Sequence, residues 1–149
     1  MATVQELKQS PVQVASMLVG AAFLLVGILG FVPGITQHFG DIKFAGGDSH
    51  AELLGLFQVS ALHNVVHLVF GVLGLAAART SGTARMFLVG GGAVYLALWV
   101  YGMAIGHDSG ANFVPFNTAD NWLHLGLGSA MVLVGVTLGR EVGHAVSPA

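Results

Sequence analysis

The sequence predicts an all-α integral membrane protein, a bundle of four transmembrane helices. Hydrophobic residues make up 54% of the 149-residue chain and charged residues only 8%, whereas a soluble domain carries about a quarter charged residues. The mean hydropathy is +0.79. The chain also contains four apolar stretches, each close to the roughly 20 residues that a helix needs to cross a bilayer. Most of the surface is therefore expected to face lipid.

The four stretches form a single transmembrane domain over residues 1–149. Ser10, Pro11 and Gln13 form a capping-box pattern at the start of the first span, and Pro33-Gly34 ends it. Ser49 and Glu52 repeat the capping-box pattern before the second apolar stretch. The predicted spans cover residues 11–32, 50–78, 84–105 and 118–139.

The basic residues predict which ends of the helices lie in the cytoplasm. Lys8, Arg79, Arg85 and Arg140 fall on one side of the predicted bundle, and only Lys43 falls on the other. Cytoplasmic loops carry an excess of Lys and Arg. We therefore expect a multi-pass protein with both termini in the cytoplasm.

Composition also excludes several classes of function. The net charge is −2, so there is no basic surface for nucleic acid. The chain has no cysteine, which excludes disulfides, thiolate metal sites and cysteine nucleophiles. No nucleophile–base pair, phosphate-binding loop or carboxylate pair stands out. The sequence therefore favours a protein that is not an enzyme.

Two segments repeat one pattern. Residues 64–71 and 121–128 both read N-x-x-H-L-x-x-G, and in this register His63 falls opposite Asp120. Asn and His are rare in membrane spans, so their shared spacing is more informative than the Leu and Gly positions. A duplicated two-helix hairpin would explain the pattern and predicts two pseudo-symmetric halves. His67 and His124 would then face each other.

The predicted depths of the histidines in the membrane argue against equivalent positions in the two repeated segments. With the predicted boundaries, His63 and His67 lie near the middle of the second span, whereas His124 lies near the outer end of the fourth. Counting about 1.5 Å per residue, the two groups differ in depth by roughly 10 Å. The repeat predicts equal depth, and the sequence leaves this conflict open.

Three interpretations of the polar residues remain open. They could cross-link helices two and four by hydrogen bonds, since polar groups in hydrocarbon need partners. They could form a site for haem or a transition metal, because imidazole is a common ligand and His63 and His67 share a helix face. They could line a pathway for protons or a small molecule. The candidate cofactor-binding residues are His63, His67, His124, Asn64 and Asn121, and the candidate metal ligands are His63, His67, His124 and Asp120.

Several segments resemble a bacterial family known as domain of unknown function 4383. The similarity rests on residues 55–59, 62–68, 78–80, 90–92 and 117–124. It implies a four-helix protein of the bacterial inner (plasma) membrane and carries no activity with it. The expected partners are the lipid bilayer and, beyond it, a homo-oligomer or a larger membrane complex.

Overall fold

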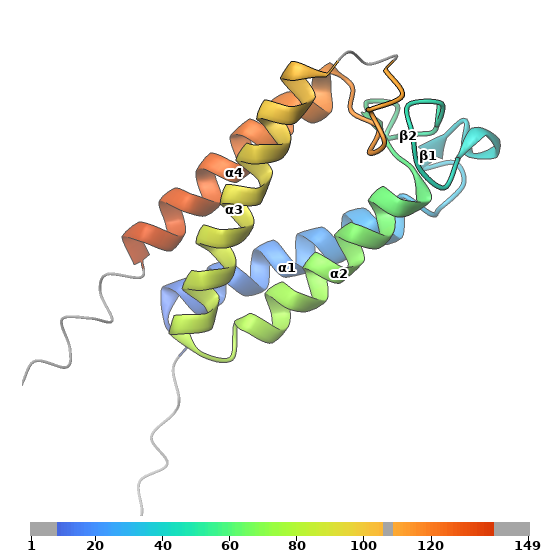
Figure 1. Ribbon diagram of the computed structural model, residues 1–149. Helices are drawn as coiled ribbons and strands as arrows, with labels where there is room; N and C mark the ends of the chain where they lie inside the picture. The colour runs from blue at the N-terminus through green and yellow to red at the C-terminus, as the bar shows by residue number, and fades with distance from the viewer. Residues whose placement is uncertain (1–8, 106–108, 139–149) are drawn as a thin grey trace, which may run out of the picture.

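The fold is described here from a computed structural model, which defines residues 9–105 and 109–138. It is mostly helical, which confirms the predicted fold class. The four helices are α1 (Pro11–Leu29), α2 (Ala61–Ala77), α3 (Ser81–Ala104) and α4 (Thr118–Leu138). Short loop elements connect α1 to α2, as Figure 1 shows.

The helices are arranged as two pairs, α1 with α2 and α3 with α4 (Figure 1). The two pairs diverge from the end of the molecule that carries the short α2–α3 turn. At this end the side-chain amide of Gln13 on α1 donates to the carbonyl of Ala78, at 2.9 Å. The hydroxyls of Ser10 and Ser81 lie 2.8 Å apart. The start of α1 is therefore fastened to the α2–α3 turn.

The second helix is shorter than the sequence predicted. It begins at Ala61, and residues 50–60 contain two short strands instead of helix. The strands are β2 (Glu52–Leu53) and β3 (Phe57–Gln58), and the turn between them places Leu54 and Gly55 at positive φ, 57° and 67°. Positive φ at consecutive residues is incompatible with a right-handed helix. The predicted start at residue 50 is wrong because this apolar segment packs as a hairpin.

The α1–α2 connection forms a small antiparallel sheet. Strand β1 (Thr36–Gln37) pairs with β2, and β2 pairs with β3; a 3-10 turn, η1 (Phe39–Asp41), follows β1. Ala51, Leu53 and Val59 are buried beneath the sheet against apolar residues at the end of α1. The connection is therefore a folded cap over the diverging ends of the helices.

Three helices, α1, α3 and α4, are long and apolar enough to cross a membrane. The fourth, α2, is also apolar but has 17 residues, about 26 Å at 1.5 Å per residue. Large apolar side chains on all four helices are exposed, for example Leu18 at 66% and Leu133 at 64%. Such a surface is compatible with a membrane protein.

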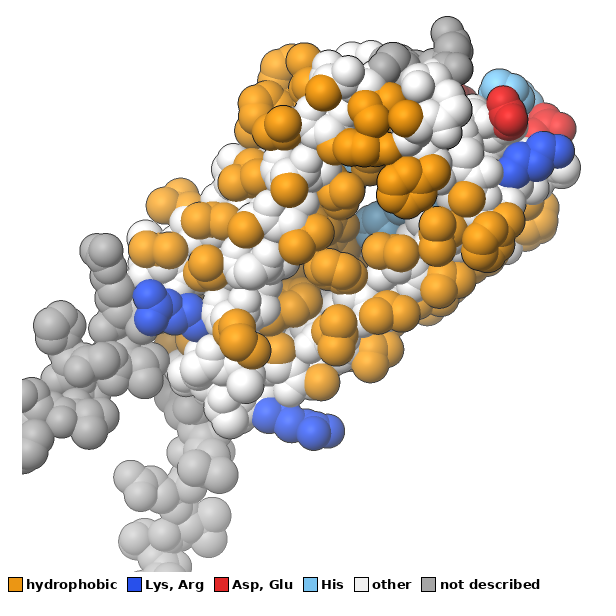
Figure 2. All heavy atoms as spheres, in the orientation of Figure 1, with side chains coloured by type: hydrophobic (Ala, Val, Ile, Leu, Met, Phe, Trp, Pro, Cys, Tyr) orange, Lys and Arg blue, Asp and Glu red, His pale blue; other side chains and the backbone are white. Residues whose placement is uncertain are grey.

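Charged side chains lie at the two ends of the molecule, as Figure 2 shows. Arg79 and Arg85 are exposed beside the α2–α3 turn. Asp41, Lys43 and Asp48 are exposed in the α1–α2 connection at the opposite end. Lys8 and Arg140, which also contribute to the predicted orientation, lie outside the described residues.

Candidate functional site

The helices α2 and α4 begin in the same way. Ser60 precedes α2, and its hydroxyl accepts a hydrogen bond from the His63 backbone N–H at 3.1 Å. Asn117 precedes α4, and its side-chain oxygen accepts from the Asp120 backbone N–H at 3.0 Å. Ser and Asn are favoured at this position because their side chains satisfy a free N–H of the first turn.

These two starting points place the repeated residues at matching positions. His63 and Asp120 are the third residues of their helices, Asn64 and Asn121 the fourth, and His67 and His124 the seventh. The conflict of depth in the sequence came from the wrong start of the second span. Once α2 begins at Ala61, both groups occupy the first two turns of their helices.

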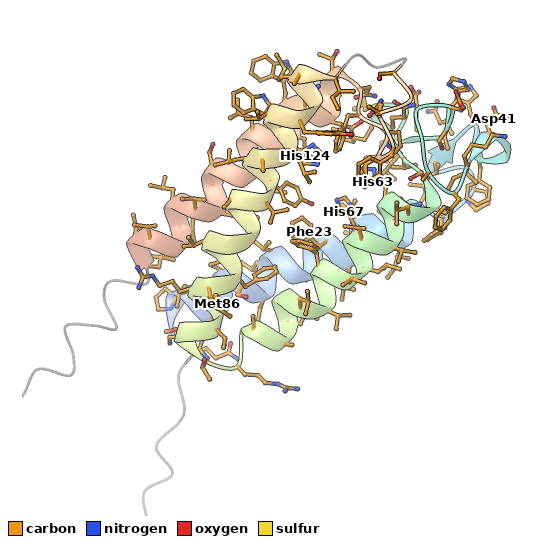
Figure 3. The ribbon with its side chains drawn as sticks, viewed as in Figure 1. Phe23, Asp41, His63, His67, Met86 and His124 are labelled. Carbon is orange, nitrogen blue, oxygen red and sulfur yellow. The ribbon has the colours of Figure 1, made fainter. Side chains whose placement is uncertain are left out.

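Five of the six repeated polar residues border a cavity of about 500 Å³ between the two helix pairs: His63, Asn64, His67, Asp120 and His124. The side chains of His63, His67, His124 and Phe23 point toward the space between the pairs, as Figure 3 shows. The hollow is also visible in Figure 2, where a histidine side chain lies inside it. The remaining wall is mostly aliphatic, from α1, α4 and the sheet: Leu18, Val19, Ala22, Leu25, Val26, Leu29, Leu53, Leu54, Val59, Leu123 and Leu127.

His67 joins α2 to α3 through Tyr95. Its Nδ1 lies 3.0 Å from the carbonyl oxygen of His63, and its Nε2 lies 3.1 Å from the Tyr95 hydroxyl. A carbonyl oxygen only accepts, so Nδ1 carries the proton and, in the uncharged ring, Nε2 accepts from Tyr95. The Tyr95 ring stacks on Phe23 of α1, with centroids 5.3 Å apart. Tyr95 thus contacts both helices of the first pair.

His63 and Asp120 both bond to the backbone of Gln58 in β3. His63 Nδ1 lies 3.2 Å from the Gln58 carbonyl oxygen, and the Gln58 N–H donates to Asp120 Oδ2 at 3.0 Å. The same carboxylate oxygen accepts from the Asn117 N–H at 3.1 Å. The Asn117 amide donates to the Leu56 carbonyl at 2.8 Å. The start of α4 is therefore hydrogen-bonded to the sheet that precedes α2.

His124 packs between two aromatic rings. Its ring centroid lies 4.9 Å from Tyr95 and 4.9 Å from Phe116. Its Nδ1 is buried and makes no hydrogen bond of ordinary geometry. No hydrogen bond joins His124 to His67. Instead, Tyr95 contacts both rings, so that the connection from α2 runs through α3.

Asn64 lines the cavity together with the histidines, whereas Asn121 does not. Each packs inside its own helix pair, Asn64 against Gly30 beyond the end of α1 and Asn121 against Gly102 near the end of α3. A methyl group at either glycine would overlap the asparagine side chain. Asn121 also donates to the Gly102 carbonyl at 3.2 Å. Asn121 is therefore hydrogen-bonded to the other helix of its pair, whereas the Nδ2 of Asn64 is buried without a hydrogen bond among the described residues.

The glycines of the two pairs meet in corresponding ways. A Cβ at Gly20 would lie 2.9 Å from the carbonyl oxygen of Gly71, and a Cβ at Gly92 would lie 2.7 Å from that of Gly128. Such contacts let helix backbones approach closely in lipid. Gly20 and Gly92 are separated by the same number of residues as Phe23 and Tyr95. An alignment of α1 with α3 that matches the two glycines therefore also matches the two aromatic residues.

The candidate metal ligands do not form a coordination set. Across residues 9–105 and 109–138, no group of three or more His, Cys, Asp or Glu side chains is placed to hold a metal ion. Both nitrogens of His67 lie at hydrogen-bonding distance from protein oxygens. Coordination of a metal or a haem iron by His67 would require one of these two hydrogen bonds to break.

Two features of the site were missed in the sequence. Gln58 was assigned to a helix, so its two backbone contacts could not be foreseen. A second cavity of about 200 Å³ opens between α2 and α3 and shares His63, His67, Tyr95 and His124 with the first. The sequence contains one indication of this site at Tyr95, because a tyrosine deep in an apolar helix needs a hydrogen-bond partner.

The chain was compared with known proteins and families. No curated protein and no solved structure matches it. A family model described as "Domain of unknown function (DUF4383)" matches residues 13–137, which include all four helices except the first two residues of α1 and the last residue of α4. The chain belongs to the DUF4383 family, as the resemblance in its sequence predicted.

Proposed function

We propose that this chain is a small, non-enzymatic membrane protein that binds a small molecule between its two helix pairs. The observation that carries the proposal is the 500 Å³ cavity, whose apolar wall is interrupted by His63, His67, Asp120 and His124. Ligand sites are commonly apolar cavities of about 300–1,000 Å³ with a few polar groups that orient the ligand. Polar groups at membrane depth are costly unless they serve structure or function.

The surface supports the placement in a membrane. The helices expose apolar side chains along their length, and the charged residues lie at the ends. The exposed Arg79 and Arg85 favour the cytoplasm for the end with the α2–α3 turn. Together with Lys8 and Arg140, they support a bacterial plasma-membrane protein whose two termini are cytoplasmic.

A duplicated helical hairpin underlies the cavity in this proposal. The matching positions of Ser60 with Asn117, His67 with His124 and Gly71 with Gly128 support it. So does the correspondence of Phe23 with Tyr95, which stack on each other. The two halves are similar, but they contact each other through different side chains, such as Phe23 and Tyr95. The cavity is the space between these halves.

The polar residues have a structural role as well. The His67–Tyr95 bond and the Gln58–Asp120 bond both connect the first half of the chain to the second. Each such bond in a membrane contributes about 0.6 kcal/mol on average. They therefore hold the two pairs at a fixed separation, and this separation defines the cavity.

The test compares two neighbouring alanines on α1. Ala22 and Ala21 are both exposed, but only Ala22 lines the cavity. Protein purified in mild detergent is extracted with organic solvent, and the extract is analysed by mass spectrometry. We expect a small molecule to co-purify in stoichiometric amount with the natural protein and with Ala21→Trp, and to be lost from Ala22→Trp.

The same preparations distinguish the haem and metal alternatives. An absorption spectrum with a Soret band, or stoichiometric metal in an elemental analysis, would overturn the proposal in favour of a redox role. Extracts that do not differ between Ala21→Trp and Ala22→Trp would mean that the cavity holds nothing specific, and would also contradict it.

A further inference from the structure

The larger cavity opens sideways, on the surface that the helices expose between α1 and α4. Among its lining residues, Leu18 is 66% exposed, Leu25 57% and Leu123 44%. A mouth made of exposed leucines on helices that could cross a membrane faces hydrocarbon rather than water. A molecule that reaches the cavity by this route must be soluble in the lipid.

Three polar side chains of the cavity, His63, Asp120 and Tyr95, offer free hydrogen-bond acceptors, and a fourth, Asn64, has a buried amide nitrogen that makes no hydrogen bond within the described residues. His63 Nδ1 lies 3.2 Å from a carbonyl oxygen, so it is the nitrogen that donates, and in the uncharged ring Nε2 is an acceptor. No hydrogen bond reaches this Nε2 within the described part of the chain. His63 is only 7% exposed and borders both cavities, so its free nitrogen lies in an apolar enclosure.

Asp120 and Tyr95 add further acceptors. The two bonds to the Asp120 side chain both go to Oδ2, and Oδ1 accepts none among the described residues. Tyr95 gives its hydroxyl proton to His67, which leaves the lone pairs of its oxygen available. An unmade hydrogen bond at a buried acceptor is costly. The acceptors of His63, Asp120 and Tyr95 are therefore complementary to a ligand that donates a hydrogen bond.

The charges at the site exclude acidic lipids. No lysine or arginine lines the cavity, so a carboxylate or phosphate headgroup would be buried without a counter-charge, beside Asp120. Burial of an unpaired charge is strongly unfavourable. Aromatic side chains, by contrast, are available: Phe23, Phe57 and Tyr95 form part of the wall. Aromatic rings pack favourably against another ring.

We infer that the ligand is an uncharged, hydroxyl-bearing lipophile with an aromatic ring, of the phenol or quinol class, which enters from the membrane between α1 and α4. The hydroxyl donates to His63 Nε2 or Asp120 Oδ1, and the apolar tail lies along Leu18, Ala22 and Leu25. This inference rests on the proposed binding function and specifies its ligand.

The experiment uses three probes that share one tail. They are 4-dodecylphenol, its methyl ether 4-dodecylanisole, which has no donor, and 4-dodecylbenzoate, which is charged. Occupancy of the full-length protein is measured by native mass spectrometry after release from detergent. The proteins are the natural chain, Ala22→Trp with its control Ala21→Trp, and His63→Leu with its control His50→Leu, whose histidine is exposed on the sheet side.

We expect the phenol to bind the natural chain, Ala21→Trp and His50→Leu, and to lose its site in Ala22→Trp. Compared with the phenol on the natural chain, the ether should bind at least about tenfold more weakly because it has no hydrogen-bond donor. The phenol should bind His63→Leu more weakly to a similar degree because the acceptor is missing. If His63→Leu does not fold, the comparison of phenol with ether on the natural chain decides alone. Equal binding of phenol and ether, or stronger binding of the benzoate, would overturn the inferred ligand class and leave the binding function standing. Binding of none of the three would contradict both.

Discussion

Tyr95 and His67 form a hydrogen bond across the space between the two helix pairs, with 3.1 Å between the hydroxyl oxygen and Nε2. Tyr95 also stacks on Phe23 and contacts His124. A single side chain of α3 thus touches α1, α2 and α4. Its position explains how two histidines that share no hydrogen bond belong to one site.

The first prediction concerns this bond. Tyr95→Phe keeps the ring and removes the hydroxyl, which leaves His67 Nε2 without its donor. We expect a loss of about 0.5–1.5 kcal/mol in the free energy of unfolding, measured by thermal unfolding in detergent.

A double-mutant cycle isolates the bond. Tyr95→Phe and His67→Leu should show a coupling energy of about 0.5 kcal/mol or more, since either change removes the same bond. His67→Leu combined with Tyr101→Phe is the control, because Tyr101 bonds to the Ala111 carbonyl in the α3–α4 connection. Additive effects in the Tyr95 cycle would show that the bond contributes nothing.

The second prediction concerns helix packing within the two pairs. Gly20→Ala and Gly92→Ala should each destabilise the protein by about 1–3 kcal/mol, because the new methyl group would lie 2.8 and 2.7 Å from backbone atoms of the partner helix. Gly90→Ala and Gly126→Ala are matched controls, since a Cβ at either position meets no atom within 4 Å.

If the two pairs are halves of a duplication, the losses at Gly20 and Gly92 should be similar. A large loss at one of them and none at the other would contradict equivalent packing. The four stabilities can be compared in one thermal unfolding series.

The third prediction concerns Asp120 and the sheet. Asp120→Ala removes the acceptor for the backbone N–H groups of Gln58 and Asn117, and a buried donor left without its partner costs about 1–3 kcal/mol. We expect faster amide hydrogen exchange at Gln58 and Asn117. Asp120→Asn should have a smaller effect, since its amide oxygen still accepts. Asp48→Asn is the control, because Asp48 is exposed. Unchanged amide exchange at Gln58 and Asn117 in Asp120→Ala would refute the proposed role of the Asp120 carboxylate.

The fourth prediction concerns orientation in the membrane. The chain has no cysteine, so single cysteines can be labelled without background. Gly82 follows the α2–α3 turn and Gly110 lies in the α3–α4 connection, and both have open space around the Cβ position. In intact cells, an impermeant thiol reagent should label Gly110→Cys and spare Gly82→Cys. The reverse pattern would invert the proposed topology.

The sequence predicted the helices well wherever composition alone determines them. Apolar stretches with Pro and Gly boundaries located α1, α3 and α4 to within a few residues. The prediction for α2 began too early because Ser49 and Glu52 imitate a capping box, while the hairpin that replaces the helix depends on tertiary contacts of Leu53 and Val59. Local patterns do not record such contacts.

The candidate site was predicted only in part. The spacing of His67 and His124 indicated two matching positions, and both residues line the cavity. Their connection through Tyr95 could not be predicted, because the sequence does not specify how α3 sits between the halves. The packing of Asn64 against Gly30 and of Asn121 against Gly102 likewise depends on tertiary contacts that the sequence does not specify.

The most direct test of the account is to locate the ligand. A dodecylphenol that carries a diazirine in its tail is photoactivated with the protein in detergent, and the modified residues are mapped by peptide mass spectrometry. The account predicts adducts concentrated at the cavity mouth, on Leu18, Ala22 and Leu123, which disappear when excess 4-dodecylphenol is present. Adducts spread equally over exposed positions outside the cavity, such as Val72 and Leu133, and unchanged by the competitor, would contradict a binding site between the helix pairs.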